Sequence, residues 1–139
     1  MPDDLVLVDT SAWIAFFRDP ESAVGALVDR LLDEDCAAIV PVVRAELLQG
    51  ARSEAEFERL GRLLGALELL REPDDVWDRV ARLGYDLRRH GVNGVGIPDL
   101  LVAAAAVEHD VPVLTLDADF ARVTAVCALR LARPPGGVG

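Results

Sequence analysis

Short apolar runs alternate along the chain with segments in which apolar residues recur at helical spacing. The short runs predict buried strands, and the helical spacing predicts amphipathic helices. The strands are expected at residues 5–8, 37–40, 67–70 (a short edge strand), 113–116 and 128–131. The helices are expected at residues 21–34, 42–51, 54–66, 73–90 and 98–109, with a short one after residue 9 capped by Thr10 or Ser11. Strands and helices in this order predict an α/β fold, a three-layer sandwich with a central parallel sheet of about five strands flanked by helices.

The length of 139 residues suits one domain, expected at 1–132, with a loose tail at 133–139. Cys36 and Cys127 do not form a CxxC pair, which suits reduced thiols of a cytoplasmic protein. The acidic start lacks the basic region of a signal peptide, and the longest apolar run, residues 100–107, is too short to span a bilayer. We therefore expect a cytoplasmic protein without a membrane anchor.

The charge narrows the function classes. The chain has 24 acidic residues against 14 basic ones, a net charge of -10, and every basic residue is an arginine. Such a balance disfavours nonspecific binding of duplex nucleic acid. The absence of lysine excludes Schiff-base chemistry and the Walker-A phosphate loop.

Two acids directly follow predicted strands. Asp9 ends LVLVD, and Asp117 ends VLTLD, so each acid lies at the carboxyl end of its strand, before a short helix. If the strands are neighbours, the two carboxylates converge at one edge of the sheet. The alternative explanation for each acid is that it caps the helix that follows. For Asp9 this alternative is weaker, because Thr10 or Ser11 can cap that helix. Asp119 is ambiguous in the same way.

Two more acids lie in predicted helices. Asp99 follows Pro98 in the first turn of an almost wholly apolar helix, where favourable interaction with the helix dipole is the alternative explanation. Glu46 lies beside an apolar stripe, where the alternative is a buried ion pair with an arginine.

Together, these acids on four separate elements predict a cation site. Carboxylates this close cannot all remain ionised without a cation, and oxygen ligands suit Mg²⁺ or Mn²⁺. No cluster of His or Cys indicates zinc, since His90 and His109 fall near predicted helix C-termini.

The pattern resembles the PIN domain, and in particular the VapC-like toxins of type II toxin–antitoxin systems. The resemblance rests on LVDTSAWIAFF, VVRAELLQGAR and IPDLLVAAAAVEHDVPVLTLDADFARV, and extends over nearly the whole chain. It implies a Mg²⁺- or Mn²⁺-dependent endoribonuclease that cleaves selected structured RNA, such as tRNA or rRNA loops. The catalytic and metal-binding residues that it implies are Asp9, Glu46, Asp99 and Asp117, with Asp119 as a fifth candidate ligand and Thr10, Ser11 and Thr115 as supporting hydroxyls. Pro98 departs mildly from the family, which often has a polar residue there.

The resemblance also implies partners. A cognate VapB-like antitoxin would bind over the helices at 21–34 and 54–66, and the chain would form a homodimer. The glycine-rich segment at 91–96 is interpreted as a mobile rim of the site. The arginines expected to steer RNA are Arg18, Arg44, Arg52, Arg88, Arg89 and Arg122.

Three other functions compete with this one. A phosphatase with an aspartate nucleophile at Asp9 needs a second acid two residues later, where the chain has Ser11, and a lysine. A receiver-type phosphoacceptor also needs a lysine. A non-catalytic PIN-like binding module would not need the full set of acids, but an activity assay is required to reject it.

Overall fold

The structure, a computed structural model, describes residues 4–133. Within this part of the chain, four strands form one parallel sheet in the order β3-β2-β1-β4. The strands are β1 (Val6–Val8), β2 (Ala37–Ile39), β3 (Glu68–Leu69) and β4 (Val113–Leu114). The parallel α/β architecture predicted from the alternating pattern is therefore confirmed.

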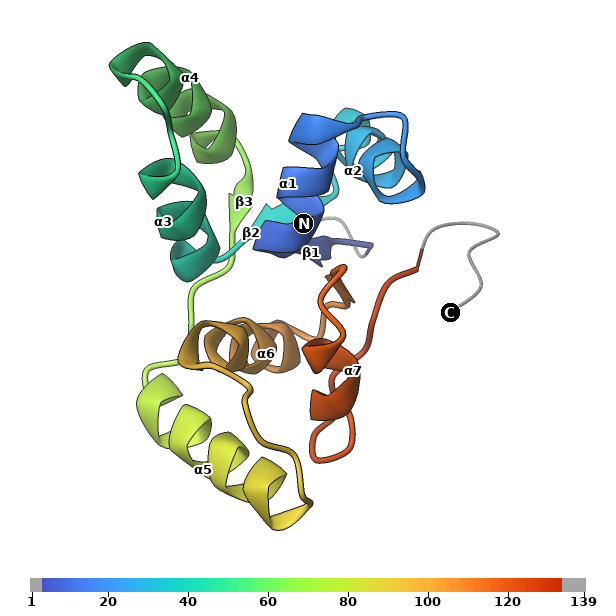
Figure 1. The fold of residues 1–139 in the computed structure, drawn as a ribbon, viewed down its shortest axis with the longest axis vertical. Helices are drawn as coiled ribbons and strands as arrows, with labels where there is room; N and C mark the ends of the chain where they lie inside the picture. Colours follow the sequence, from blue (N-terminus) through green and yellow to red (C-terminus); the bar gives the residue numbers. More distant parts are fainter. Residues whose placement is uncertain (1–3, 134–139) are drawn as a thin grey trace.

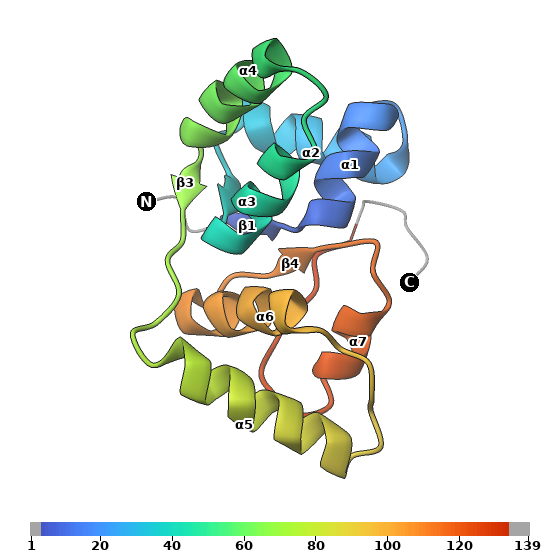
Figure 2. The same ribbon diagram turned by 60° about the vertical axis from the view of Figure 1, so that its left-hand side comes forward.

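Helices cover both faces of the sheet (Figures 1 and 2). They are α1 (Thr10–Arg18), α2 (Ala23–Asp33), α3 (Pro41–Gln49), α4 (Glu54–Gly65), α5 (Val76–Arg89), α6 (Ile97–His109) and α7 (Asp119–Val123). Figure 2 shows α1 to α4 on one side of the strands and α5 to α7 on the other. β2 and β3 are added in turn on one side of β1, and β4 is then added on the other side, so the strand order switches between β1 and β4. In open parallel sheets, ligands bind at this switch point.

The expected fifth strand at 128–131 is absent from the described residues, so the prediction of about five strands was wrong. Only a single bridge joins Val113 and Leu131, through hydrogen bonds from Val113 N to Arg130 O and from Ala132 N to Val113 O. The reason lies in β4, which has only two residues, Val113 and Leu114, and so offers little backbone for a fifth strand to pair with. Because β4 is so short, the segment at 128–131 forms only this one bridge and no longer run of backbone pairs.

Other predicted boundaries differ by a few residues. α5 begins at Val76, not at Pro73, and α3 takes in Pro41 as its first residue. Proline fits there because the first helical position needs no N–H donor. The predicted tail lies, apart from Arg133, outside the described residues, and the extent of the single domain stays a prediction.

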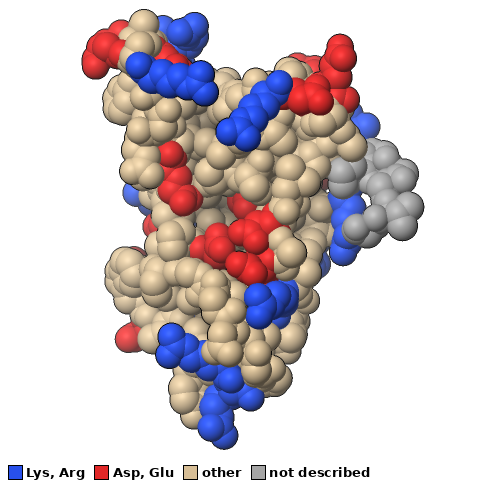
Figure 3. All heavy atoms as spheres, in the orientation of Figure 1, with Lys and Arg blue, Asp and Glu red and all other residues tan. Residues whose placement is uncertain are grey.

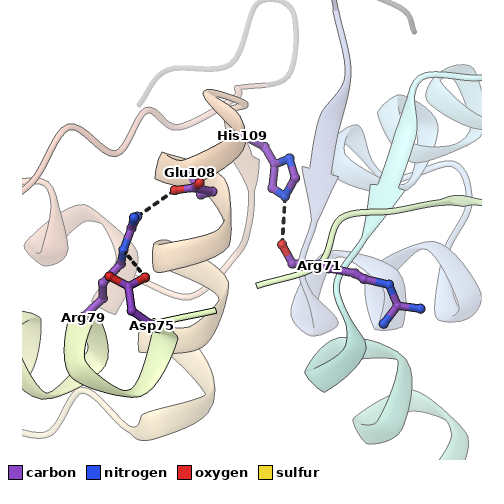
Figure 4. Close-up of polar contacts among 5 residues, drawn as sticks. All are labelled: Arg71, Asp75, Arg79, Glu108 and His109. Atoms are coloured by element: carbon purple, nitrogen blue, oxygen red, sulfur yellow. Dashed lines mark hydrogen bonds and ion pairs between the residues drawn. The ribbon is translucent and has the colours of Figure 1, made fainter. Parts of the chain in front are cut away.

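α5 is attached to α6 through polar contacts at one end (Figure 4). Arg79 of α5 donates to Asp75 at 2.9 Å and to Glu108 of α6 at 2.7 Å. His109 Nε2, at the end of α6, donates at 2.8 Å to the carbonyl of Arg71, in the segment that leads into α5. α6 itself is the central helix, with its side chains from Leu100 to Ala106 buried. In the described part of the chain, no helix has the length and apolar character needed to cross a membrane.

Candidate functional site

The four acids predicted from strand ends and helix positions line one pocket of about 230 Å³ at the carboxyl end of the sheet. Asp9 follows β1, Asp117 lies beyond β4, Glu46 comes from α3 and Asp99 from the first turn of α6. Figure 3 shows acidic side chains gathered in the middle of this face, between the α1–α4 half and the α5–α7 half. Four elements that are distant in sequence therefore present their carboxylates to one space.

Asp9 is the most enclosed of these acids, with an exposed fraction of 5%. Its Oδ1 accepts hydrogen bonds from the Ser11 hydroxyl at 2.7 Å and from the Ala12 amide at 3.2 Å, and its Oδ2 accepts one from the Thr115 hydroxyl at 2.7 Å. Burial raises the pKa of Asp9 above its ordinary value, while the Ser11, Thr115 and Ala12 hydrogen bonds oppose that rise. The side chain is thus fixed in orientation through both oxygens.

Asp9 is also the N-cap of α1, so the prediction that Thr10 or Ser11 caps this helix was wrong. The backbone of Asp9 is extended, with φ -83° and ψ 174°, whereas Thr10 is already the first helical residue. One carboxylate can cap a helix and face a site at the same time, because it has two oxygens. The cap and the site are therefore not alternatives for Asp9.

Glu46 is oriented by the first residue of α1. The Thr10 hydroxyl donates to Glu46 Oε1 at 2.8 Å, across 36 positions of sequence. The alternative explanation, a buried ion pair with an arginine, is wrong for the described residues, among which Glu46 forms no salt bridge. Thr10 thus joins α1 to α3 at the edge of the pocket.

Ser11 and Thr115 connect the start of α1 to the end of β4. Their hydroxyl oxygens are 3.3 Å apart, Leu116 N donates to Ser11 Oγ at 2.9 Å, and Asp117 N donates to Thr115 Oγ1 at 2.9 Å. This network places Asp117 next to Asp9 and explains the similar local sequences after the two strands. The predicted hydroxyls therefore lie at the site, held by hydrogen bonds within the protein.

Asp99, Asp117 and Asp119 each offer an oxygen within 4.8 Å of the others, the spacing of a group that can hold one metal ion. Partial burial, followed by the negative charges of Asp117, Asp9, Asp119 and Glu46, raises the pKa of Asp99 to about 6. A set of carboxylate oxygens that repel one another fits a hard divalent cation such as Mg²⁺ or Mn²⁺.

Asp119 is connected by an arginine to the glycine-rich segment at 91–96. Arg122 Nη1 donates to Asp119 Oδ1 at 3.1 Å, and Arg122 Nη2 donates to the carbonyl of Asn93 at 3.2 Å, in the glycine-rich segment. The sequence indicates Arg122 as a residue that steers RNA, but it does not predict this connection. The sequence indicates the Asp119–Arg122 pair only through the spacing of three residues, which places both side chains on one side of a helix.

The two histidines lie at helix C-termini, as predicted, and neither lines the acidic pocket. His90 follows α5 and donates through Nδ1 to Asp86 O at 2.9 Å, and His109 donates to Arg71 O at the far end of α6. Both are exposed. Nothing in their positions suggests zinc binding or general base catalysis.

Comparisons with known proteins show what the chain as a whole is similar to. Residues 6–126 match the PIN domain family. Ribonuclease VapC11 of Mycobacterium tuberculosis (strain ATCC 25618 / H37Rv) is 36% identical over 126 residues, covering 86% of this chain and 94% of the relative.

Solved structures are similar to the chain as well. The toxin–antitoxin structure of VapBC-5 from Mycobacterium tuberculosis has a similar chain, with 29% identity, a TM-score of 0.66 and coverage of 95% of this chain and 99% of that one. A chain of VapBC2 from Rickettsia felis, solved with a DNA fragment from its promoter, has a TM-score of 0.73, covers 92% of this chain and 97% of its own, and at 18% identity shows the fold alone.

Proposed function

This chain belongs to the PIN domain family, and we propose that it is a metal-dependent endoribonuclease, the VapC-like toxin of a type II toxin–antitoxin pair. The observation that carries the proposal is the convergence of Asp9, Glu46, Asp99 and Asp117 on one pocket. A relative with 36% identity carries the name ribonuclease, and the shared length covers most of both chains.

The chemistry of the donors supports Mg²⁺ or Mn²⁺ as the cofactor. Asp99, Asp117 and Asp119 would hold the ion, with Asp9 and Glu46 at the adjoining side of the pocket. When bound, such an ion lowers the pKa of a coordinated water and neutralises charge on the phosphodiester. Burial is the largest cause of the raised pKa of Asp99, and the negative charges of the neighbouring acids add to it, so a bound cation would relieve that second part.

The protein side chains position the reacting groups. Ser11 and Thr115 fix the two oxygens of Asp9, and Thr10 fixes Glu46, so little reorganisation is needed when RNA binds. Water attacks the phosphorus, the bond to the 3′ oxygen breaks, and the products are a 3′-hydroxyl and a 5′-phosphate. The 2′-hydroxyl takes no part in this step.

The proposed partner is a VapB-like antitoxin. VapBC-5 of Mycobacterium tuberculosis, whose toxin–antitoxin structure contains the similar chain at 29% identity, supports this partner. In the present chain, a hollow of about 350 Å³ between α1 and α4 is lined by the apolar Phe17, Leu60 and Leu63 and by the charged Glu56 and Arg59, and Phe17 is 43% exposed. An apolar hollow of this kind suits an antitoxin helix. We also propose a homodimer, a cytoplasmic location, and selected structured RNA, such as tRNA or rRNA loops, as the substrate.

The test is cleavage of RNA by the purified protein with Mg²⁺ or Mn²⁺, with and without EDTA. Asp9→Ala and Asp99→Asn should abolish cleavage while the circular dichroism spectrum stays folded. The matched control is Asp74→Asn, which changes an exposed acid outside the pocket and should leave cleavage unchanged. Wild-type cleavage that persists in EDTA would exclude the metal mechanism.

The same assay tests the alternative of a non-catalytic PIN-like binding module, for which RNA would bind without being cleaved under any divalent cation. The phosphatase alternative is less favoured by the structure. A phosphatase with Asp9 as nucleophile needs a second acid two residues later and a lysine, but the chain has no lysine and has Ser11 at that position, where its hydroxyl donates to Asp9.

A further inference from the structure

A second hollow lies beside the acidic pocket, on the other side of the first turn of α6. It has a volume of about 520 Å³ and lies between the C-terminal half of α5, the segment at 91–96 and the start of α6. Ile97 and Leu100 face this hollow, whereas Asp99 and Val102 face the acidic pocket. Only one helical turn separates the two spaces, and Ile97 on that turn is 50% exposed.

The lining of this hollow differs from the rest of the surface. The chain carries 24 acidic residues, yet none lines the hollow, and Arg88 is the one charged residue among the described lining residues. The nearest acid on the same helix, Asp86, pairs with Arg82 at 3.2 Å and lines a different hollow, between α5 and α6. Figure 3 shows basic side chains over α7 and over the C-terminal end of α5, below the acidic patch. The hollow therefore tolerates an anionic ligand that the acidic surface would otherwise repel.

An exposed aromatic ring forms one wall. Tyr85 is 55% exposed, and the Arg82 guanidinium lies 5.6 Å from the centre of its ring. An aromatic side chain next to arginines is the usual platform on which single-stranded nucleic acids stack their bases.

The opposite rim is connected to the acidic pocket. Arg122 donates to Asn93 O in this rim and to Asp119 at the pocket, so one side chain spans both sites. Gly94, also in the rim, has φ +88°, and a Cβ there would meet nothing within 4 Å. The positive φ of Gly94, and not close packing, therefore favours glycine here. The space beside Gly94, at the entrance to the hollow, is open.

We propose that this hollow is a nucleotide subsite for single-stranded RNA, in which a base stacks on Tyr85 and the adjoining phosphate meets Arg88. The inference rests on the proposed ribonuclease function and specifies a substrate segment beyond the cleaved bond. The volume is within the range of about 300–1,000 Å³ that small ligands occupy. Stacking is tolerant of sequence, so the subsite selects unpaired RNA and not a particular base.

Equilibrium binding gives the first test, with a fluorescein-labelled single-stranded RNA of about ten nucleotides. Binding is measured in the Asp99→Asn background, which prevents cleavage. Tyr85→Ala should raise Kd about 5- to 100-fold, the effect of losing one base–aromatic stack. Tyr85→Phe keeps the ring and should stay within about twofold of the parent. The matched control is Trp77→Ala, which removes a 64% exposed aromatic from the same helix but outside the hollow.

The phosphate contact has its own readout. Arg88→Gln should lower the slope of log Kd against log salt by about one, whereas Arg30→Gln, at an exposed arginine of α2 outside the hollow, should leave it closer to the parent. In cleavage by the otherwise wild-type protein, Tyr85→Ala should raise KM and leave kcat within about twofold, because the subsite binds but does not touch the reacting bond.

Cross-linking locates the contact directly. RNA containing 4-thiouridine should cross-link under ultraviolet light to the tryptic peptide 83–88, which contains Tyr85. A Kd in Tyr85→Ala equal to that of Trp77→Ala, or no cross-link to this peptide, would overturn the subsite. If Tyr85→Ala loses RNA binding and its molar mass in solution also falls, the subsite is overturned as well, because this face would then bind a second copy of the chain.

These outcomes separate the subsite from the ribonuclease function. If RNA is cleaved with metal but Kd does not depend on Tyr85, the subsite fails and the ribonuclease stands. If Kd depends on Tyr85 but no cleavage occurs with any divalent cation, the ribonuclease fails and the subsite stands. If this RNA is not bound at all, the subsite fails, and the cleavage assay with divalent cation alone decides the ribonuclease function.

Discussion

Asp9 combines two properties that oppose each other. Its burial disfavours the charged form, and the donors Ser11, Thr115 and Ala12 N favour that form. The hydroxyl of Thr115 has a second task, because it accepts the amide hydrogen of Asp117 while it donates to Asp9. One side chain thus supports two of the four acids of the pocket.

Thr115→Val tests this support. The change keeps the shape but leaves a buried carboxylate oxygen without its donor, so we expect the free energy of unfolding to fall by about 1–3 kcal/mol. Urea denaturation at pH 7 measures it. The control is Thr124→Val, where an exposed hydroxyl donates only to Ala121 O and we expect a loss of no more than about 0.5 kcal/mol. Equal losses in the two variants would contradict the role given to Thr115.

Asp99 makes the stability of the metal-free protein depend on pH. Its pKa rises from 3.8 to about 6 on folding, so the folded state holds the proton more tightly than the unfolded state. Stability contributed by this group is therefore greatest below about pH 4 and is lost as the pH rises through about 6. Asn cannot ionise, so Asp99→Asn should melt at a higher temperature than the wild type at pH 7 in EDTA.

The pH profile distinguishes this cause from a general change in packing. The difference in Tm between Asp99→Asn and the wild type should shrink toward zero near pH 4, where both side chains are neutral. Asp74→Asn, which changes an exposed acid, should show a smaller difference at pH 7. A gain for Asp99→Asn that stays the same from pH 4 to pH 7 would contradict the ionisation of Asp99 as its origin.

At the level of single residues, the sequence predicted which acids meet, but not what holds them. Asp9 and Asp117 were found because each ends an apolar strand, and strand ends in a parallel sheet meet at one edge. The bonds from Thr10 to Glu46 and from Arg122 to Asn93 span 36 and 29 positions. Such contacts depend on side-chain orientation in the folded chain, which periodicity does not describe.

Among the elements, two helical glycines have opposite roles. Gly25 lies in the first turns of α2, where a Cβ would clash with the carbonyl of Asp19 and approach Ser22 Oγ at 2.9 Å. Gly65 ends α4, where a Cβ would meet nothing within 4 Å. The close approach of α2 to the turn after α1 therefore requires glycine, whereas the end of α4 does not.

Substitution by alanine should separate the two. Gly25→Ala should lower the free energy of unfolding by about 1–3 kcal/mol, because the backbone must shift to admit the methyl group. Gly65→Ala should raise it by about 0.4–1 kcal/mol, because alanine restricts the unfolded chain and fits the helix. Guanidinium denaturation of both variants measures the difference, and destabilisation by Gly65→Ala would show that the end of α4 is more tightly packed than its surroundings indicate.

The elements also show where periodicity reaches its limit. Long amphipathic segments such as α2 and α4 were predicted within two residues at each end, since their apolar stripes extend over several turns. The segment at 128–131 has the composition of a strand, but its neighbour β4 is only two residues long. Strand formation depends on a partner, and the sequence of one segment does not show how long that partner is.

For the whole molecule, part of the net charge of -10 is gathered at one pocket. The acids that converge there repel one another, and this repulsion adds to burial in raising the pKa of Asp99. The metal-free fold is therefore held against this repulsion by the packing around α6 and the sheet. A divalent cation that binds the pocket in the folded state alone should stabilise the entire domain.

Addition of Mg²⁺ or Mn²⁺ to the metal-free protein should therefore raise Tm by several degrees, since a concentration of about 100 times Kd corresponds to about 2.7 kcal/mol. Differential scanning calorimetry at pH 7 measures the shift, and NaCl at matched ionic strength separates specific binding from screening. Asp117→Asn, which removes one of the three clustered carboxylates, should reduce the shift, whereas Asp74→Asn should preserve it. An equal shift in NaCl, or an undiminished one in Asp117→Asn, would show that the cation does not bind at this pocket.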